Sequence, residues 1–329
     1  MALRRGAGRL LAAVLAGLVA TTAAAGGKSD LEVVATIKPV HSLLTQLMEG
    51  VGTPTLLIEG AASPHNFALK PSGVRAINAA DVFVRVSESL EPFTGKVVRA
   101  LPDTVRLVTL ADAPGVKLLA RRTSGAFEPH THASGSAVTN GAHEDDAAPD
   151  ESVAHGREDG HIWLDPDNAK AIVAYLARVL GEAKPDAAGK LRENAERLNA
   201  RIDALTARLE AEMHPLQGKP FVVFHDAFQY FEKRFGLDAV GAITMSPDIQ
   251  PSAKRLTELR RKIKSLAAVC VFAEPLFQPN LVAAVTEGTR ARSGTLDPQG
   301  SMLGAGPELY FELMGNLADG LKACLDQPS

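Results

Sequence analysis

The feature that most constrains the fold is a strand-then-helix pattern that recurs along the chain. A short β-rich run, Val33 to Ile37, leads through Pro39 into a helical pattern. The same order returns in "VFVRVSESLEPF", "PFVVFHDAFQYFEKRFG" and "AAVCVFAEPLFQPNLVAAV". Continuous runs of Val, Phe and Ile that alternate with helices are typical of a parallel sheet covered on both faces. The sequence therefore predicts an α/β fold.

An internal similarity indicates two lobes of similar α/β build. The segment "SPHNFALKPSGVRAI", which starts at Ser63, matches "SPDIQPSAKRLTEL", which starts at Ser246, and each precedes a helix and a strand that ends in a Glu-Pro pair. The alternative is a chance likeness of Pro-Ser turns. A mature chain of about 300 residues also favours two domains.

The first 25 residues have the layout of a secretory signal peptide. Arginines at 4, 5 and 9 precede an apolar run, Leu10 to Ala20, and a tail that reads "TTAAAGG". We expect cleavage after Ala25 and export of a soluble protein. The alternative is a buried N-terminal helix. Loss of these arginines makes the net charge of −3 more negative, and with no basic stripe this argues against nucleic acid as a partner.

One segment, 123–160, differs in composition from the rest. It holds eight acidic residues, one basic residue and four of the nine histidines, with mostly Gly, Ser, Ala and Pro between them. It cannot bury enough apolar surface to offset the entropy of ordering, so we predict a disordered insertion.

Regular structure is expected to resume at "HIWLDPDNAKAIVAYLARVLGEAKP". Asp165 is a good N-cap and Pro166 suits the first helical position. We predict a helix over 165–183 that joins the lobes, followed by a second helix. The apolar face of that second helix is predicted to comprise Leu191, Leu198, Ile202, Leu205 and Leu209.

Three histidines stand at junctions between predicted elements, where α/β proteins place ligand-binding groups. They are His65 in a turn, His161 before "IWL", and His225 at the end of the strand "FVVF". Their wide separation excludes a small zinc finger and fits a site built from several loops. Three neutral imidazoles suit zinc, and Asp297 in "GTLDPQG" is a candidate fourth ligand.

The two cysteines, Cys270 and Cys324, lie in the C-terminal half of the chain. In an oxidising compartment we expect a disulfide between them. Two buried free thiols or a cysteine metal site are the alternatives, and the absence of CxxC spacing makes a metal site the weaker one.

Five motifs together resemble one known family. "SPHNFALKPS", "HIWLDP", "FHDAFQYFEKRFG", "VFAEPLFQP" and "GTLDPQG" are similar to motifs of the ZnuA-like periplasmic zinc-uptake solute-binding proteins of ABC transporters. The likeness extends from about residue 31 to Leu325 and includes a His/Asp-rich insertion just upstream of the second motif.

This resemblance implies two Rossmann-like lobes with parallel sheets, bridged by one long helix, with the metal in the cleft between them. His65 and His161 match the ligands of the N-terminal lobe and His225 that of the C-terminal lobe. Manganese-binding relatives have Glu at the last position, so His225 favours Zn²⁺. Several zinc-binding relatives have Glu where this chain has Pro64, which leaves Asp297 or water as the fourth ligand.

The expected organisation is a signal peptide (1–25), an N-terminal lobe (26–164), the joining helix (165–183) and a C-terminal lobe (184–329). We expect a monomeric periplasmic receptor, not an enzyme, that delivers zinc to an ABC permease. The alternatives are a manganese or iron receptor, a zinc hydrolase and, with least support, an adhesin. The sequence lacks the HExxH motif, which argues against a zinc hydrolase.

Two further expectations concern histidines. The insertion is predicted to bind zinc weakly through His130, His132, His143 and His155, the alternative being a solubilising loop without a metal role. Because imidazole ligands must be deprotonated, zinc binding is expected to weaken below about pH 6.

Overall fold

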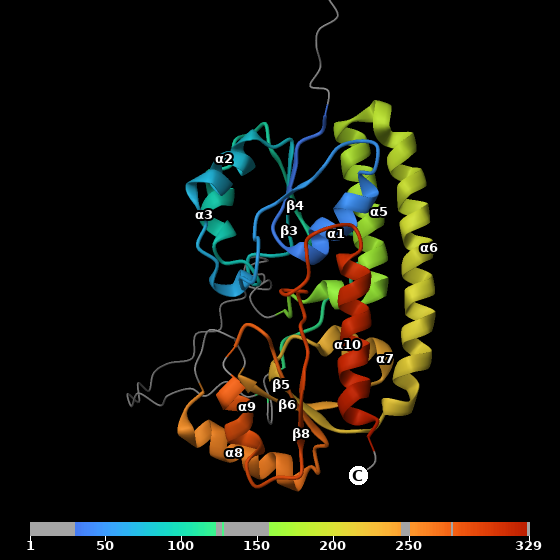
Figure 1. Cartoon of the computed structure of the whole chain (residues 1–329). Helices are drawn as coiled ribbons and strands as arrows, with labels where there is room; N and C mark the ends of the chain where they lie inside the picture. Colours follow the sequence, from blue (N-terminus) through green and yellow to red (C-terminus); the bar gives the residue numbers. More distant parts are fainter. Residues whose placement is uncertain (1–29, 123–126, 128–157, 245–250, 278, 328–329) are drawn as a thin grey trace, which may run out of the picture.

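Two four-stranded parallel sheets form the framework of the protein, as a computed structural model shows (Figure 1). The strand order is β2-β1-β3-β4 in the first sheet and β6-β5-β7-β8 in the second, so the two sheets have the same topology. Parallel neighbours need crossover connections, and helices supply most of them. The predicted α/β fold with two similar lobes is confirmed.

The structure describes residues 30–122, 127, 158–244, 251–277 and 279–327. The predicted signal peptide lies outside these ranges, and so do the four histidines predicted to bind zinc weakly. Within these ranges, no helix is both long enough and apolar enough to cross a lipid bilayer.

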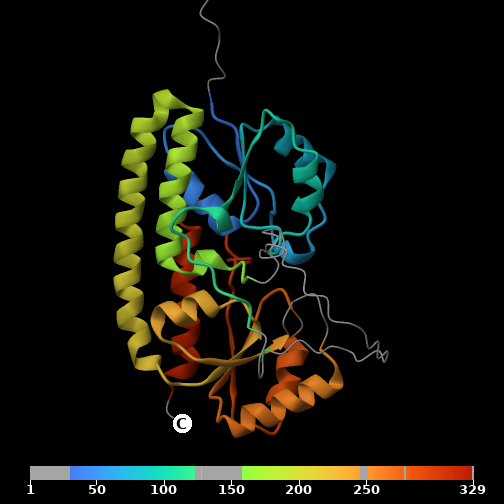
Figure 2. The ribbon, with the colours of Figure 1, turned by 180° about the vertical axis from the view of Figure 1, so that it is seen from behind.

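In the N-terminal lobe, helices α2 and α3 lie on one side of the sheet, and α1 and α5 on the other (Figure 1, Figure 2). The central strands are buried at every position because their Val, Phe and Ala side chains face helices on both sides. The elements of this lobe are β1 (Val33–Ala35), α1 (Lys38–Leu47), β2 (Thr55–Leu56), η1 (Pro64–Asn66), α2 (Pro71–Ala79), β3 (Val82–Arg85), α3 (Thr94–Arg99), β4 (Arg106–Thr109) and η2 (Leu110–Asp112).

A helical hairpin follows the N-terminal lobe. The short turn η4 (Ile162–Leu164) leads into α5 (Pro166–Ala183), where the Asp165 side chain accepts a hydrogen bond from the Asp167 backbone N–H, as predicted for an N-cap. Helix α6 (Ala188–Met213) returns between the turns η5 (Pro185–Ala187) and η6 (His214–Leu216).

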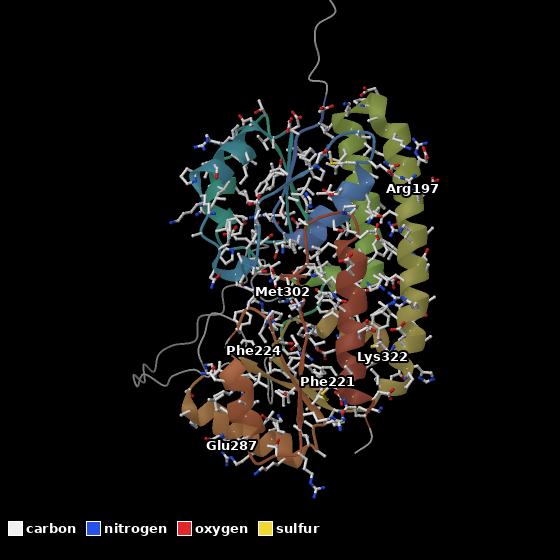
Figure 3. The ribbon with its side chains drawn as sticks, viewed as in Figure 1. Arg197, Phe221, Phe224, Glu287, Met302 and Lys322 are labelled. Atoms are coloured by element: carbon white, nitrogen blue, oxygen red, sulfur yellow. A yellow bond between two sulfur atoms is a disulfide. The ribbon has the colours of Figure 1, made fainter. Side chains whose placement is uncertain are left out.

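The long helix that bridges both lobes is α6 (Figure 2). The predicted helix over 165–183 is present as α5, but it packs along α6 beside the N-terminal lobe. Ion pairs link each half of α6 to other elements: Arg197 contacts Glu49 at 2.5 Å, and Glu212 contacts Lys322 of α10 at 3.5 Å. Figure 3 labels Arg197 and Lys322 at these two levels.

In the C-terminal lobe, α8 and α9 lie on one side of the sheet, and α7 and α10 on the other (Figure 1). Cys270 of β7 and Cys324 of α10 form a disulfide, which confirms the predicted bond and ties the last helix to the sheet. The elements of this lobe are β5 (Phe221–His225), α7 (Gln229–Phe235), β6 (Ala239–Thr244), α8 (Ala253–Ser265), β7 (Cys270–Ala273), α9 (Pro279–Thr286), β8 (Arg292–Thr295) and α10 (Leu309–Leu325).

The lobes share one continuous hydrophobic core. It runs through α1, α5, α6 and α10 and reaches strands of both sheets, and the five apolar positions predicted for the second helix are buried in it. A smaller apolar cluster lies under the outer helices of each sheet. Burial of apolar surface across the junction therefore holds the lobes together.

A buried lysine adds a polar connection between the lobes. The Lys38 ammonium group, at the start of α1, donates to the carbonyl oxygens of Ser301 at 2.8 Å, Leu303 at 2.9 Å and Gly300 at 3.4 Å. These residues belong to the turn Asp297–Leu303, which connects β8 toward α10. Lys38 thus uses its three donors on one turn.

Candidate metal site

The three predicted histidines meet between the lobes. His65 lies in η1, His161 immediately precedes η4, and His225 is the last residue of β5. Each offers a ring nitrogen, and these three atoms all lie within 4.8 Å of one another. Segments far apart in the sequence therefore converge as the motif spacing predicted.

The rings surround a small common volume. Their centroids are 5.5 Å apart for His65 and His161, 5.7 Å for His65 and His225, and 5.2 Å for His161 and His225. The Nε2 atoms of His161 and His225 are 3.4 Å apart. A tetrahedral zinc ion with nitrogens at ~2.0 to 2.1 Å holds its ligand atoms about this far apart.

Local sequence explains how each histidine reaches this position. The Ser63 hydroxyl accepts a hydrogen bond from the His65 backbone N–H at 3.3 Å and so caps η1. Gly160 lets the chain pass Leu90 closely before His161, since a Cβ there would lie 2.8 Å from the Leu90 side chain. His225 is fixed by β5, which is buried along its whole length.

Asp159 orients the ring of His161. Its Oδ1 atom accepts from His161 Nδ1 at 2.7 Å and from the His161 backbone N–H at 3.0 Å. Both residues are buried, and the Tyr230 hydroxyl donates to the Asp159 carbonyl at 2.8 Å. Donation from Nδ1 leaves the lone pair of Nε2 directed at the cluster, the arrangement usual for a metal-ligating histidine.

Glu274 does the same for His225. Its Oε1 atom accepts from His225 Nδ1 at 2.5 Å and from the His225 backbone N–H at 3.2 Å. Burial lowers the pKa of His225, but the charge and hydrogen bond of Glu274 outweigh burial, so the pKa is raised above its ordinary value. The carboxylate therefore makes this imidazole more basic and a stronger ligand.

His65 has the opposite electrostatic environment. Burial, followed by the proximity of His161 and His225, lowers its pKa well below the ordinary value. Its Nε2 atom is buried without a hydrogen-bond partner. A buried acceptor without a partner is costly, and a metal ion would satisfy it.

The histidines line a cavity of about 280 Å³ between the lobes. Asp226, beside His225, also lines it but is held by Arg122, which contacts both Asp226 and Glu232. Burial raises the pKa of Glu232 to about 7, with the Arg122 hydrogen bond opposing that rise. This buried ion pair anchors the chain just before residue 123 to the C-terminal lobe.

Asp297 lies apart from the three-histidine group. Its Oδ1 atom accepts from the Gln299 backbone N–H at 3.1 Å, and its Oδ2 atom from the Ser301 hydroxyl at 2.8 Å and the Met302 backbone N–H at 3.3 Å. Both oxygens of Asp297 therefore stabilise the turn that Lys38 also binds. Figure 3 places Met302 between the two lobes.

The two other histidines in the described part have local roles. Ring atom Nε2 of His41 lies 3.0 Å from the Pro54 carbonyl, and burial lowers the pKa of this histidine. His214 is exposed in η6 at the end of α6. Neither belongs to the three-histidine group.

Sequence reasoning missed Asp159 and left Glu274 without a firm role. Asp159 was grouped with the acidic insertion expected to extend to residue 160, whereas Glu158 pairs with Ala120 in an antiparallel bridge and residues 158–160 have defined positions. The Asp-Gly-His order, with the acid two residues before a ligand, could have identified Asp159. Trp163 packs against His161 at 5.4 Å between ring centroids, as expected.

The donor set fits a zinc ion. Three imidazoles, two of them buried and fixed by buried carboxylates, form a nitrogen-rich group. Soft or borderline cations prefer such ligands, whereas manganese prefers oxygen. The fold and the site together define a two-lobed, metal-binding solute-binding protein.

Comparisons with known proteins agree with this class. The family model described as "Zinc-uptake complex component A periplasmic" matches residues 33–324, and the chain belongs to this family, ZnuA. It is 43% identical over 306 residues to the "High-affinity zinc uptake system protein ZnuA" of Brucella suis biovar 1 (strain 1330), with 90% of this chain and 92% of the relative covered.

Two more distant proteins extend the likeness. The protein of the same description from Yersinia pestis is 34% identical, with 89% of this chain and 91% of the relative covered. The crystal structure of a Zn(II)-bound variant of AdcAII from Streptococcus pneumoniae is similar with a TM-score of 0.69 at 23% identity, covering 89% of this chain and 99% of that chain. The latter likeness shows the shared fold.

Proposed function

We propose that the protein is the high-affinity zinc receptor of an ABC-type uptake system. It captures Zn²⁺ in the periplasm and delivers it to an inner-membrane permease, acting as a monomer. The observation that carries this proposal is the group of three histidine nitrogens within 4.8 Å, fixed by Asp159 and Glu274. Family membership and the descriptions of the relatives support the same function.

The ligand chemistry favours zinc over the alternatives of manganese and iron. All three residues that converge offer nitrogen, and the nearby carboxylates of Asp159 and Glu274 are hydrogen bonded to ligand rings. Hard divalent cations such as Mn²⁺ prefer carboxylate and carbonyl oxygens. Competition between Zn²⁺ and Mn²⁺ for the wild-type protein is therefore expected to favour Zn²⁺ strongly.

The geometry supports a receptor better than a zinc hydrolase. A hydrolase needs a general base that can reach a metal-bound water. The two acids that line the cavity are already engaged, Asp159 with His161 and Asp226 with Arg122. We therefore expect no turnover of ester or peptide substrates by the zinc-loaded protein.

For the fourth coordination position we propose a ligand from solution, water in the simplest case. Asp297, the alternative ligand, uses both carboxylate oxygens to hold its own turn. Coordination by Asp297 would require it to give up these hydrogen bonds. A position open to solution also suits a receptor that must release its ion to a permease.

Calorimetry of His225→Ala tests the site. The substitution removes one of three nitrogen ligands, so zinc affinity is expected to fall by at least 100-fold. His214→Ala is the matched control, because His214 is exposed and lies outside the group. Equal zinc affinities of His225→Ala and wild type would refute the assignment.

We also propose that the insertion binds additional zinc weakly through His130, His132, His143 and His155, as a local reservoir or sensor. The support is compositional, since imidazoles among carboxylates suit zinc. A variant lacking residues 124–158 is expected to bind fewer zinc ions and to sustain uptake less well under zinc starvation. Unchanged stoichiometry and uptake would leave only a solubilising role.

A further inference from the structure

Arg121 is an exposed arginine beside the three histidines, and a guanidinium cannot itself hold a metal ion. It lines the same cavity as the three histidines. Its Nε atom donates to the Glu158 carbonyl at 3.0 Å, and its Nη2 atom to the Ser89 carbonyl at 3.2 Å. These bonds join the two ends of the insertion and the loop after β3, so the guanidinium is held in place by backbone on two sides.

The adjacent arginine, Arg122, differs from Arg121 because carboxylates neutralise its charge. Arg122 pairs with two buried carboxylates, Asp226 and Glu232. Arg121, by contrast, has only carbonyl partners among the described residues. A guanidinium has more N–H donors than two hydrogen bonds use, so Arg121 keeps both its charge and free donors for another acceptor.

The hydrogen bonds around the cavity point to an anion. Asp226 and Glu232 pair with Arg122, and Asp159 and Glu274 bind the rings of His161 and His225. Arg121 has carbonyl partners alone among the described residues, and it lies close enough to His65 to help lower the pKa of that ring. The remaining N–H groups of Arg121 are therefore available to a negatively charged ligand beside the histidines.

The cavity has room for such a ligand. Its volume is about 280 Å³, whereas one water molecule needs roughly 15 Å³ of comparable space. The Ser89 residue, whose carbonyl binds Arg121, also lines it. The space next to the histidines can therefore accommodate an ion together with a small second ligand.

We propose that the site takes zinc together with one small anion, a halide or a monocarboxylate, which completes the metal coordination and is held by Arg121. This inference rests on the proposed zinc-receptor function and deepens it, because it names the form in which the ion is bound. With zinc held by the three histidines, the anion would fill the remaining coordination position, and Arg121 would donate N–H groups to it. Charge-assisted hydrogen bonds of this kind are among the strong ones in proteins.

Cobalt(II) substitution provides the test, because its visible spectrum reports changes of ligand. The Co²⁺-loaded protein is titrated with sodium chloride and, separately, sodium acetate, at constant ionic strength kept with perchlorate. We expect a saturable spectral change in the wild type. In Arg121→Gln the anion dissociation constant is expected to rise tenfold or more, as for the loss of a hydrogen bond to a charged group. Arg121→Lys keeps the positive charge but lacks the paired N–H groups of a guanidinium. Its anion dissociation constant should lie between those of the wild type and Arg121→Gln.

Controls separate this proposal from the receptor function. Arg290→Gln, an exposed arginine that lines a different hollow of the C-terminal lobe, should bind the anions like the wild type. Unchanged Co²⁺ stoichiometry and circular dichroism of Arg121→Gln exclude misfolding. Failure of the wild type to bind Co²⁺ or Zn²⁺ at all would refute the receptor function. Normal metal binding with no anion response, or with equal anion affinity in Arg121→Gln, would overturn the anion site alone.

Discussion

At the scale of single residues, the three histidines of the candidate site differ in their surroundings. His161 and His225 each have a buried carboxylate on Nδ1. His65 is half-buried, and its buried Nε2 atom has no hydrogen-bond partner. The carboxylates fix the tautomer and the orientation of two rings, so we expect zinc affinity to depend on acids outside the three-histidine group.

Glu274→Gln tests the contribution of one such acid. The amide can still occupy the space but no longer carries the charge that makes His225 basic, so zinc affinity is expected to fall by about 10- to 100-fold. Glu59→Gln, an exposed glutamate of the N-terminal lobe, is the control. Calorimetry that finds both variants equal to wild type would show that Glu274 does not support the ligand.

The pH dependence of zinc binding follows from the raised pKa of His225. A proton must leave this ring before zinc can bind, so affinity falls as the pH drops through the pKa of His225, which is above the ordinary 6.5. His65, with its lowered pKa, stays neutral over that range. Zinc titrations in buffers of different ionisation enthalpy should detect proton release on zinc binding, and Glu274→Gln should release less. The absence of proton release, or equal release by the wild type and Glu274→Gln, would contradict this role of His225.

At the scale of elements, the two lobes carry corresponding glutamates. Glu274 follows β7, and Glu91 follows β3, the strand at the corresponding position of the first sheet. Glu91 accepts from the backbone N–H groups of Val86 and Ser87 at 2.7 and 3.1 Å. The repeated Glu-Pro pair in the sequence thus lies after corresponding strands, but Glu91 binds backbone of its own loop whereas Glu274 binds the ring of His225.

Glu91 predicts a distinct pH dependence of stability. Burial raises its pKa from 4.5 to about 7 in the folded protein. Between these values the folded state holds a proton that the unfolded state has lost, so stability falls as the pH rises from 4.5 to 7 and then levels off. In Glu91→Gln the amide oxygen can accept the same two backbone hydrogen bonds. The substitution should therefore remove a pH-dependent loss of about 3 kcal/mol from the free energy of unfolding.

Urea unfolding of metal-free protein at pH 5 and pH 8 measures this difference. The free energy of unfolding of Glu91→Gln minus that of the wild type should be larger at pH 8 than at pH 5. Glu88→Gln, a nearby glutamate whose side chain is half exposed, should change little with pH. Parallel pH profiles of Glu91→Gln and wild type would show that Glu91 ionises in the folded state as it does in the unfolded one.

At the scale of the whole molecule, α6 and the shared core make the two lobes one unit, and Lys38 adds a buried connection. Its ammonium group binds the turn whose Pro298 carbonyl accepts from the Trp163 indole N–H at 2.8 Å. Trp163 in turn packs against His161. A chain of contacts therefore leads from the start of α1 through the Asp297 turn to His161 of the candidate site.

Lys38→Met tests the cost of losing this connection. Methionine fills similar space but cannot donate, which leaves the carbonyls of the turn without their buried partner, and stability should fall by about 2 to 4 kcal/mol. Lys233→Met, an exposed lysine of α7, is the control. Urea midpoints measure the loss, and equal midpoints for the two variants would show that the Lys38 contacts contribute nothing net.

The sequence predicted much of this arrangement because the signals were local. The strand runs, the Asp165 cap and the junction positions of His65, His161 and His225 all depend on neighbouring residues. The role of Lys38 depends on a turn 263 residues away, and the role of Glu274 depends on His225, 49 residues away. Asp297 was predicted as one of two options for the fourth ligand, and its oxygens accept hydrogen bonds within the turn to which Lys38 donates. Such long-range contacts follow only from the packing of the two lobes.

Anomalous diffraction at the zinc edge, from crystals of the zinc-loaded protein, tests the central claim most directly. We predict one strong peak between the lobes at ~2.0 to 2.1 Å from a ring nitrogen of each of His65, His161 and His225. Asp297 should still hold its turn in the same crystals. A strong peak elsewhere, with none among the three histidines, would contradict the account.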